Sequence, residues 1–299
     1  MKLPFASVTL SAALLLGGWV PVHAELALDS GVVNAAPAPS IPSAASVGPM
    51  LFISQTLNNC GPSSVAEVLD FYGIHRSQGQ VQAVLRADGN PGGMSPFGIP
   101  AYVRGLGMAS LMGAGGSDLL VKTLVANGFP VIVSQWVSLG DHYGHYRPIQ
   151  SYDDSRGVFV SSDPYLGPGH AIGYDEFDKI WASSNNRFYV IYPPQRKAQL
   201  MTLLSSTGWD QTAALQADIA IQQERMNGGI DGPQGWGFRR GYSALSMAWD
   251  YLQLGDAGAS QRALDFAGNH GASPVVIGWI AGELKLRQQA APGAGATAS

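Results

Sequence analysis

Apolar side chains recur every three or four residues in three stretches of the first half of the chain, which is the spacing of one buried helix face. The first stretch follows Cys60 and ends at Gly73, a residue type that commonly terminates helices. The other two cover residues 96–106 and 117–128, the latter with a serine in the N-cap position. The pattern therefore predicts three amphipathic helices in this part of the chain.

The pattern then changes to short runs that are rich in β-branched and aromatic residues. The predicted strands are residues 129–137, 145–152, 157–161 and 187–192. Turn-forming residues join the second strand to the third, which predicts an antiparallel hairpin. Helices followed by a meander of strands indicate an α+β domain, to which we assign residues 49–194.

Residues 195–287 form a second region with a helical pattern. Its middle contains two amphipathic segments joined at Gly255 and Asp256, which predicts a helical hairpin. Tyr251, Gly255, Asp256 and Ala267 are spaced as in one tetratricopeptide-like helix pair, without a second copy. We expect this small all-α region either to pack on the α+β domain or to bind a protein partner. The aromatic string 235–240 is either a contact site or a buried loop anchor.

The two ends of the chain differ in composition from the rest. Residues 1–24 combine Lys2, an apolar run and a small-residue end, which is typical of a signal peptide. Residues 25–48 are rich in Ala, Pro and Ser and predict a flexible linker, and residues 288–299 predict a disordered tail. We therefore expect an exported protein, periplasmic or extracellular, with no membrane segment after signal removal. An uncleaved N-terminal anchor is the alternative.

Composition and charge narrow the classes of function. A chain of 299 residues with 46% hydrophobic and 13% charged residues can build a packed core and is too apolar for disorder. A net charge of −4, without a cluster of Lys and Arg, argues against nucleic acid as a partner. Glycine-rich stretches lack the Lys-Ser/Thr of a phosphate loop, and metal-ligand spacings are absent. We therefore expect neither a cofactor nor a metal.

Cys60 is the only cysteine, so the chain cannot form an intrachain disulfide, although exported proteins usually carry cysteines in pairs. A lone cysteine is more often a small buried apolar side chain. Cys60, however, begins a predicted helix, where the helix dipole and unpaired N–H groups favour a thiolate and can stabilise an oxyanion. Gln55, five residues earlier, could add a side-chain amide donor. This segment thus predicts a nucleophile with an oxyanion hole.

A catalytic thiolate needs a base, which is usually a histidine. Of the six histidines, His145 begins a predicted strand and His142 lies three residues before it. His145 is the stronger candidate, because it opens the strand directly after Gly144 and its orientation would be fixed by the sheet. The alternatives are an ordinary strand residue for His145 and a metal site for the two histidines together.

Asp163 is the candidate for the third member of the site. If the hairpin turn centres on Asp154, the numbers of paired residues sum to 308, twice 154, and His145 lies opposite Asp163. Asp163 would then accept a hydrogen bond from the imidazole and fix its tautomer. A shift of one residue would separate the two onto opposite faces. Asp163 and Pro164 also resemble a turn that ends a strand, which is the alternative role of this aspartate.

Together these residues resemble the bacteriocin-processing peptidase-like branch of papain-fold cysteine peptidases. The shared features are Gln-x4-Cys-Gly-Pro-Ser, a helix ending in Phe-Tyr-Gly, a strand starting Phe-Pro-Val-Ile-Val, then Gly-His-Tyr and Asp-Pro, in this order over roughly residues 51–192. The resemblance implies a papain-like fold in which a helical part carries the cysteine and an antiparallel sheet carries the histidine. It implies these roles: Gln55 as oxyanion-hole donor, Cys60 as nucleophile, His145 as base and Asp163 as orienting acid.

The best-known members of this branch are cytoplasmic domains of export transporters, and they cut leader peptides after two glycines. This sequence contains no transporter membrane domain or nucleotide-binding motif, so that substrate class does not carry over. We expect a secreted cysteine peptidase that acts on a peptide or protein substrate. Two alternatives stay open, an acyl-transfer enzyme of the transpeptidase or transglutaminase type and a binding scaffold that has lost its activity.

Overall fold

The computed structural model describes residues 40–228 and 240–290. The predicted signal peptide, most of the predicted linker and tail, and residues 235–239 lie outside this part of the chain. Its strands are β1 (Ala44–Ser46), β2 (Ala109–Gly113), β3 (Val131–Trp136), β4 (Gly144–Asp153), β5 (Val158–Asp163), β6 (Gly167–Gly173) and β7 (Phe188–Tyr192). Its α-helices are α1 (Cys60–Phe71), α2 (Gln78–Leu85), α3 (Ile99–Arg104), α4 (Asp118–Ala126), α5 (Tyr174–Trp181), α6 (Lys197–Ser206), α7 (Gln211–Gly228), α8 (Arg240–Leu254), α9 (Ala257–Asn269) and α10 (Pro274–Ala290). Short 3₁₀ helices are η1 (Pro96–Gly98), η2 (Ala182–Ser184) and η3 (Pro194–Arg196).

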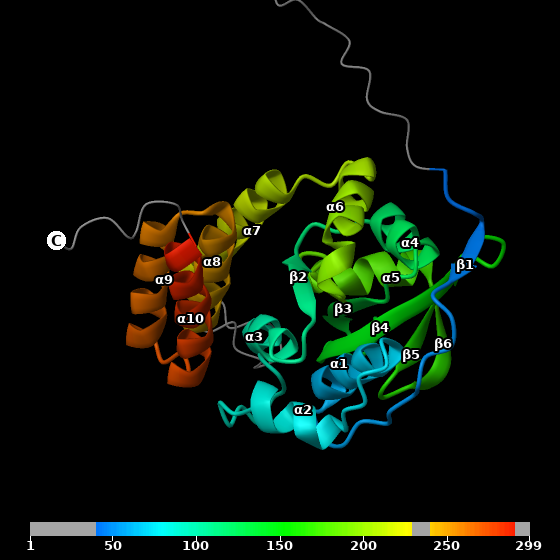
Figure 1. Ribbon diagram of the computed structural model, residues 1–299, viewed down its shortest axis with the longest axis horizontal. Coiled ribbons are helices and arrows are strands. Elements are labelled where there is room, and N and C mark those ends of the chain that lie inside the picture. Colours follow the sequence, from blue (N-terminus) through cyan, green and yellow to red (C-terminus); the bar gives the residue numbers. More distant parts are fainter. Residues whose placement is uncertain (1–39, 229–239, 291–299) are drawn as a thin grey trace, which may run out of the picture. The chain divides into compact units, whose positions relative to one another are not determined.

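The described strands form one antiparallel sheet in the order β2-β7-β3-β4-β5-β6 (Figure 1). β4 is the longest of them, and its end also pairs with β1. Helices α1 and α2 lie on one side of the sheet, and α4, α5 and α6 lie on the other (Figure 1). This arrangement confirms the expected α+β class.

The central strands are buried on both faces, which explains their nearly continuous apolar sequences. In β3, Ile132 packs in the core next to α1 and α3, whereas Val131 and Val133 pack in the core next to α4 and α5. In β7, Tyr189 faces the first core and Phe188 the second. The alternation follows from the two-residue repeat of a strand.

The three predicted helices are present. α1 ends just before Gly73, which adopts a positive φ of 77° that a side chain would disfavour. Residues 96–106 form η1 and α3, and α4 begins after Ser117, whose side chain accepts a hydrogen bond from the Leu120 N–H. The predicted strands correspond to β3, β4, β5 and β7.

Two predicted boundaries are wrong. Residues 44–46, assigned to the flexible linker, form β1, because backbone hydrogen bonds to β4 replace bonds to water. The Val47 N–H, which donates to the Gln150 carbonyl at 2.9 Å, extends this pairing. At the other end, α10 continues to Ala290 and so takes in the first three residues of the predicted tail.

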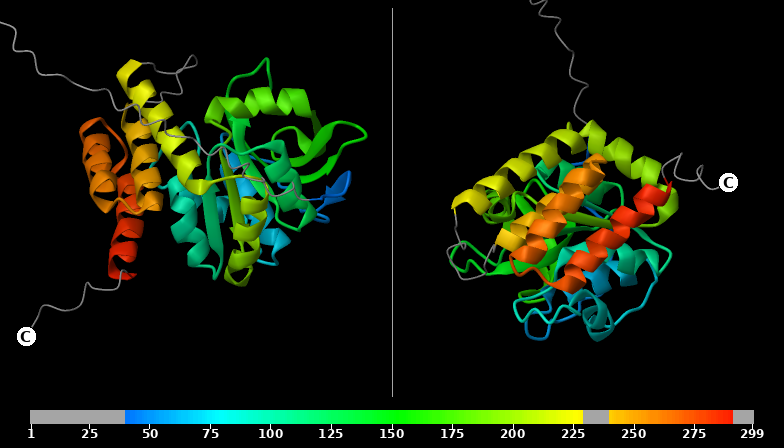
Figure 2. Two further views of the ribbon diagram at one scale, coloured as in Figure 1. Left: turned by 90° about the horizontal axis from the view of Figure 1, so that it is seen from above. Right: turned by 90° about the vertical axis from the view of Figure 1, so that its left-hand side faces the viewer.

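The predicted helical hairpin is confirmed as α8 and α9. Gly255 joins them with a φ of +82°, and Asp256 caps α9 by accepting a hydrogen bond from the Ala259 N–H at 2.8 Å. α10 packs beside both helices, and α7 packs on α8 (Figure 2). The likeness to a tetratricopeptide pair stays a prediction.

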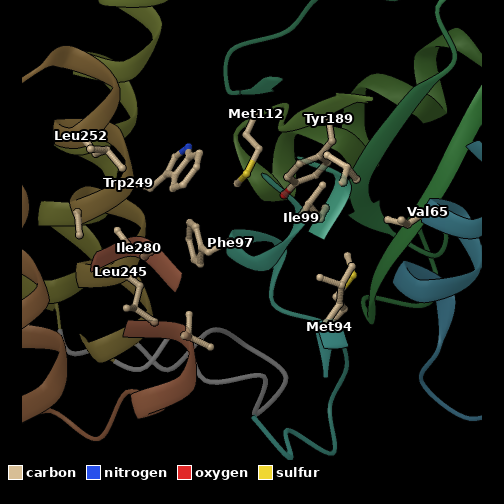
Figure 3. Close-up of a cluster of buried hydrophobic side chains, with 14 of the residues drawn as sticks. Val65, Met94, Phe97, Ile99, Met112, Tyr189, Leu245, Trp249, Leu252 and Ile280 are labelled. Carbon is tan, nitrogen blue, oxygen red and sulfur yellow. The ribbon is translucent and has the colours of Figure 1, made fainter. Parts of the chain in front are cut away.

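The helical region shares a hydrophobic core with the α+β domain. Phe97 of η1 projects from the domain toward Trp249, and their ring centroids are 6.1 Å apart (Figure 3). Gly98 lies so close to the Trp279 ring that a Cβ there would sit 3.1 Å from it. The helices therefore pack on the domain, one of the two outcomes expected from the sequence.

Candidate functional site

Cys60 is the first residue of α1, and it is 8% exposed. The backbone N–H groups of Gly61 and Tyr146 both interact with its sulfur. Ser64, one turn along α1, donates from Oγ to the Tyr146 carbonyl at 3.0 Å and thereby fastens the helix to β4. The thiol thus lies at the positive end of a helix dipole and beside the strand that carries His145.

The loop before Cys60 is held by hydrogen bonds to α2. Asn58 adopts a left-handed conformation with φ of 58°, and Asn59 is buried. Asn59 Nδ2 donates to Gln82 Oε1 at 2.7 Å, and its Oδ1 accepts from Arg86 Nη1 at 2.6 Å. These hydrogen bonds were not predicted from the sequence, because α2 itself was not predicted.

His145 and Asp163 are brought together. His145 Nε2 lies 2.9 Å from Asp163 Oδ1, and both side chains are buried. The bond to Asp163 leaves Nδ1 for the hydrogen bond between His145 and Cys60. Cys60, His145 and Asp163 therefore form a continuous hydrogen-bonded chain, with α1 supplying the thiol and the sheet supplying the other two groups.

The predicted hairpin register, however, is wrong. Near the turn the pairs are Asp153 with Val158 and Tyr152 with Phe159, whose numbers sum to 311 instead of 308. That odd sum would place His145 and Asp163 on opposite faces. A bulge between Ile149 and Ser151 shifts the sum to 310 and restores the shared face. His145 consequently reaches Asp163 diagonally and not from directly opposite.

Asp163 has further partners that hold its carboxylate. Oδ1 accepts from the backbone N–H groups of Tyr165 at 2.8 Å and Leu166 at 2.9 Å. Arg147 Nε lies 3.1 Å from Oδ2 in a fully buried ion pair. The aspartate therefore performs both roles considered from the sequence, since it ends a strand in a turn and also contacts His145.

These contacts shift three pKa values. Burial alone would raise the pKa of the Cys60 thiol, but the hydrogen bond and charge of His145, with the two N–H groups, lower it. Burial would lower the pKa of His145, but its bonds to Asp163 and Cys60 raise it. Burial likewise opposes ionisation of Asp163, yet the partners His145 and Arg147 hold its pKa well below the ordinary value. The balance favours a thiolate beside an imidazolium.

Gln55 is fixed near Asp163 through its backbone, because its N–H donates to the Pro164 carbonyl at 2.9 Å. Its side-chain Oε1 is buried and has no hydrogen-bond partner within the described residues. Two residues earlier, the Ile53 N–H donates to Glu67 Oε1 at 2.7 Å. Burial raises the pKa of Glu67 to about 8, so this carboxyl is largely neutral at pH 7 and holds the Gln55 segment without adding a charge.

Cys60 and His145 line a cleft of about 670 Å³. The α+β domain contributes Met94, Gln135 and Trp136 to it, and the helical region contributes Leu245 and Val276. Gln55 is not among the described residues that line the cleft, whereas Gln135 is. Gln135 and the second wall were not predicted from the sequence, because residues that meet only through tertiary packing leave no local signal.

Three of the other described histidines have contacts of their own. His142 lines the same cleft but stacks on Trp136, with ring centroids 3.8 Å apart. His75 pairs with Asp70, and His270 bonds to a backbone carbonyl of its own helix. Within residues 40–228 and 240–290, no group of three or more His, Cys, Asp or Glu is arranged to hold a metal ion. In the same residues, no helix has both the length and the apolarity needed to span a bilayer.

Residues 49–189 match the family described as Peptidase_C39 like family. A solved double glycine motif protease from an AMS/PCAT transporter, in complex with the leader peptide, has 19% sequence identity and a TM-score of 0.39, covering 50% of this chain and 94% of that chain. The peptidase domain of Streptococcus ComA, a bi-functional ABC transporter involved in a quorum sensing pathway, has 18% identity and a TM-score of 0.37, covering 48% of this chain and 97% of that chain. The comparison with curated proteins found no match.

The family match covers the segment that contains Cys60, His145 and Asp163. Residues 49–189 are therefore a cysteine-type peptidase domain with the papain-like α+β arrangement expected from the sequence, and the helices after residue 194 lie beyond the matched segment.

Proposed function

We propose that the protein hydrolyses peptide bonds through a Cys60-His145-Asp163 triad. His145 holds the Cys60 proton, and the thiolate attacks the peptide carbonyl to form a carbon–sulfur bond. His145 then returns the proton to the leaving amine as the carbon–nitrogen bond breaks. Water activated by His145 hydrolyses the thioester and restores the thiol. Asp163 keeps the imidazole in the required orientation throughout.

The observation that carries this proposal is the hydrogen-bonded chain from Cys60 through His145 to Asp163 at the edge of a cleft. A structural thiol in an apolar core would have a raised pKa and no such partner. The lowered pKa of Cys60, together with its position at a helix N-terminus, supports a nucleophile.

Gln55 is the proposed oxyanion donor, together with the Cys60 backbone N–H. Its support is the motif spacing and the backbone bond to Pro164, which holds it beside the strand that ends at Asp163. A Gln55→Ala variant should lose about 10²-fold in kcat, the cost of removing one oxyanion donor. An unchanged kcat would remove Gln55 from the mechanism.

We also propose that the enzyme is exported and acts on a peptide outside the cytoplasm. The support is the signal-like composition of residues 1–24. Cell fractionation of the full chain and of a chain lacking residues 1–24 tests this, and equal retention of both in the cytoplasm would contradict it.

Mass spectrometry of peptide digests tests the activity. The wild type should cleave a peptide library, whereas Cys60→Ala should leave it intact and Cys60→Ser should retain at most a trace of activity. An added amine distinguishes hydrolysis from acyl transfer, since a transferase would yield amine adducts in place of free acids. Full cleavage by Cys60→Ala would refute the proposal, and absence of both products from the wild type would indicate a binding scaffold.

A further inference from the structure

Gln135 carries an unsatisfied amide at the edge of the site. It is paired with His145 across β3 and β4, so the two side chains lie on the same face of the sheet. Gln135 is 1% exposed, and neither its Nε2 nor its Oε1 has a hydrogen-bond partner in the part of the chain that the structure describes. It also lines the cleft beside Cys60. A buried amide without partners destabilises a fold, so its retention points to a ligand that supplies the missing bonds.

The opposite wall of the cleft is apolar and comes from the helical region. Leu245 of α8 and Val276 of α10 line it, and Met94 lines the side that belongs to the peptidase domain. Met94 packs directly on Gly61, the neighbour of Cys60, since a Cβ at Gly61 would lie 2.7 Å from Met94 Cε. Figure 3 shows Leu245 and Met94 on the two sides of the core that joins the helices to the domain. Met94 is therefore held next to Cys60, while Leu245 and Val276 line the cleft from the helical region.

Charges contribute little to this cleft. Asp88 is the only carboxylate among the described residues that line it. Two arginines also line it and both have partners: Arg187 is paired with Asp218, and Arg225 donates to the Ser183 carbonyl. The lining therefore offers an unpaired amide and apolar side chains, and it favours a neutral ligand over a strongly charged one.

On the basis of the proposed function, we propose that the cleft binds an extended peptide whose backbone amide is held by Gln135 and whose apolar side chain, next to the scissile bond, fits between Met94, Leu245 and Val276. A peptide group offers one carbonyl and one N–H, which match the Nε2 donor and the Oε1 acceptor of Gln135. The helices after residue 194 thus select the substrate, although they lie outside the segment that matches the peptidase family.

Gln135→Leu tests the backbone contact. The variant should raise KM about tenfold for every cleaved peptide, because a backbone contact does not depend on sequence, and kcat should change little. Its Tm should equal or exceed that of the wild type, since the substitution removes an unsatisfied buried amide. An unchanged KM, or a fall in Tm, would overturn the assignment of Gln135.

Val276→Ala and Leu245→Ala test the apolar wall. Each should lower kcat/KM about tenfold for peptides with a large apolar residue next to the cleaved bond, and should have a smaller effect on peptides with a small residue there. Val275→Ala is the matched control, because Val275 precedes Val276 on α10 but is 37% exposed and is not among the lining residues. If the variants keep the wild-type ratio of kcat/KM between peptides with a large and a small residue at this position, the apolar wall does not select the substrate.

Two arms separate this inference from the proposed function. Alkylation of Cys60 by iodoacetamide should proceed at the wild-type rate in all of these variants, because they leave the thiol and His145 in place. Cleavage by Cys60→Ala would contradict the peptidase assignment itself. An inactive Cys60→Ala combined with unaltered preference in Leu245→Ala and Val276→Ala would contradict only the proposed substrate selection.

Discussion

Cys60, His145 and Asp163 form a chain of coupled ionisable groups at the edge of the cleft. Asp163 stays charged because His145 and Arg147 outweigh the cost of its burial. That charge helps to keep a proton on His145, and the imidazolium in turn lowers the pKa of Cys60. Arg147 is buried beside Asp163, so its charge counts in the same balance. The reactivity of the thiol therefore depends on a residue that it does not contact.

Asp163→Asn should narrow the pH profile of kcat/KM. Without the carboxylate, the pKa of His145 falls, so the alkaline limb of the profile shifts to lower pH. The pKa of Cys60 rises at the same time, so the acidic limb shifts to higher pH. Activity at the optimum should fall about 100-fold. The control is Asp153→Asn, at the partly buried C-terminal end of β4 and beside the turn, which should leave the profile unchanged. A wild-type profile for Asp163→Asn would remove Asp163 from the site.

At the scale of helices and strands, the hydrophobic pattern predicted those elements whose own residues favour the structure they form. The 3.6-residue spacing after Cys60 and the apolar run of residues 129–137 correspond to α1 and β3. β6 was not predicted, because its three glycines and one proline oppose a strand, and only pairing with β5 forms it.

The approach of His145 to Asp163 was predicted, but through the wrong register. The bulge between Ile149 and Ser151 that corrects the face has no signature in the sequence. The polar residue Gln135 and the helical wall of the cleft depend on packing between segments far apart in the chain, so no local pattern could reveal them.

Gly61→Ala tests how tightly α1 is seated. Alanine normally stabilises a helix relative to glycine, but here the new Cβ would lie 2.7 Å from Met94 Cε and 2.9 Å from Met94 Cβ. The clash should cost about 1–3 kcal/mol in the free energy of unfolding and slow the alkylation of Cys60. Adding Met94→Ala should restore part of the rate.

Gly79→Ala in α2 is the matched control for this substitution. The nearest atom to its new Cβ is Ser77 Oγ at 3.9 Å, so the variant should gain up to about 1 kcal/mol. Urea unfolding of the variants measures these differences. Equal stability of Gly61→Ala and the wild type would show that Met94 moves aside freely.

At the scale of the molecule, buried polar contacts attach the helical region to the peptidase domain within the described residues. Arg187, which precedes β7, pairs with Asp218 of α7, and Asn185 donates to Asp218 Oδ1 at 2.9 Å. Asp250 of α8 lies beside this pair, and burial raises its pKa well above the ordinary value. A second ion pair joins Arg104 to Glu283 at the surface. Helices anchored in this way can serve as one rigid wall of the cleft.

The two ion pairs should differ in their contribution to stability. Asp218→Ala should cost about 3–5 kcal/mol, because it leaves Arg187 buried without a partner. Glu283→Ala should cost at most about 1 kcal/mol, because Arg104 is half exposed and its charge is screened by solvent. Urea unfolding with equal losses for both variants would show that the Arg187 pair does not anchor the helices.

The central claim is that His145 makes Cys60 a thiolate, and the pH dependence of Cys60 alkylation tests it most directly. Iodoacetamide should modify the wild type at pH 6 at a rate close to its rate at pH 8, because the ion pair keeps the sulfur charged. In His145→Ala the rate at pH 6 should collapse and recover only as the pH approaches about 8.5, the ordinary pKa of a thiol. If the wild type and His145→Ala show the same pH dependence, the imidazole does not activate the sulfur and the account of the site is wrong.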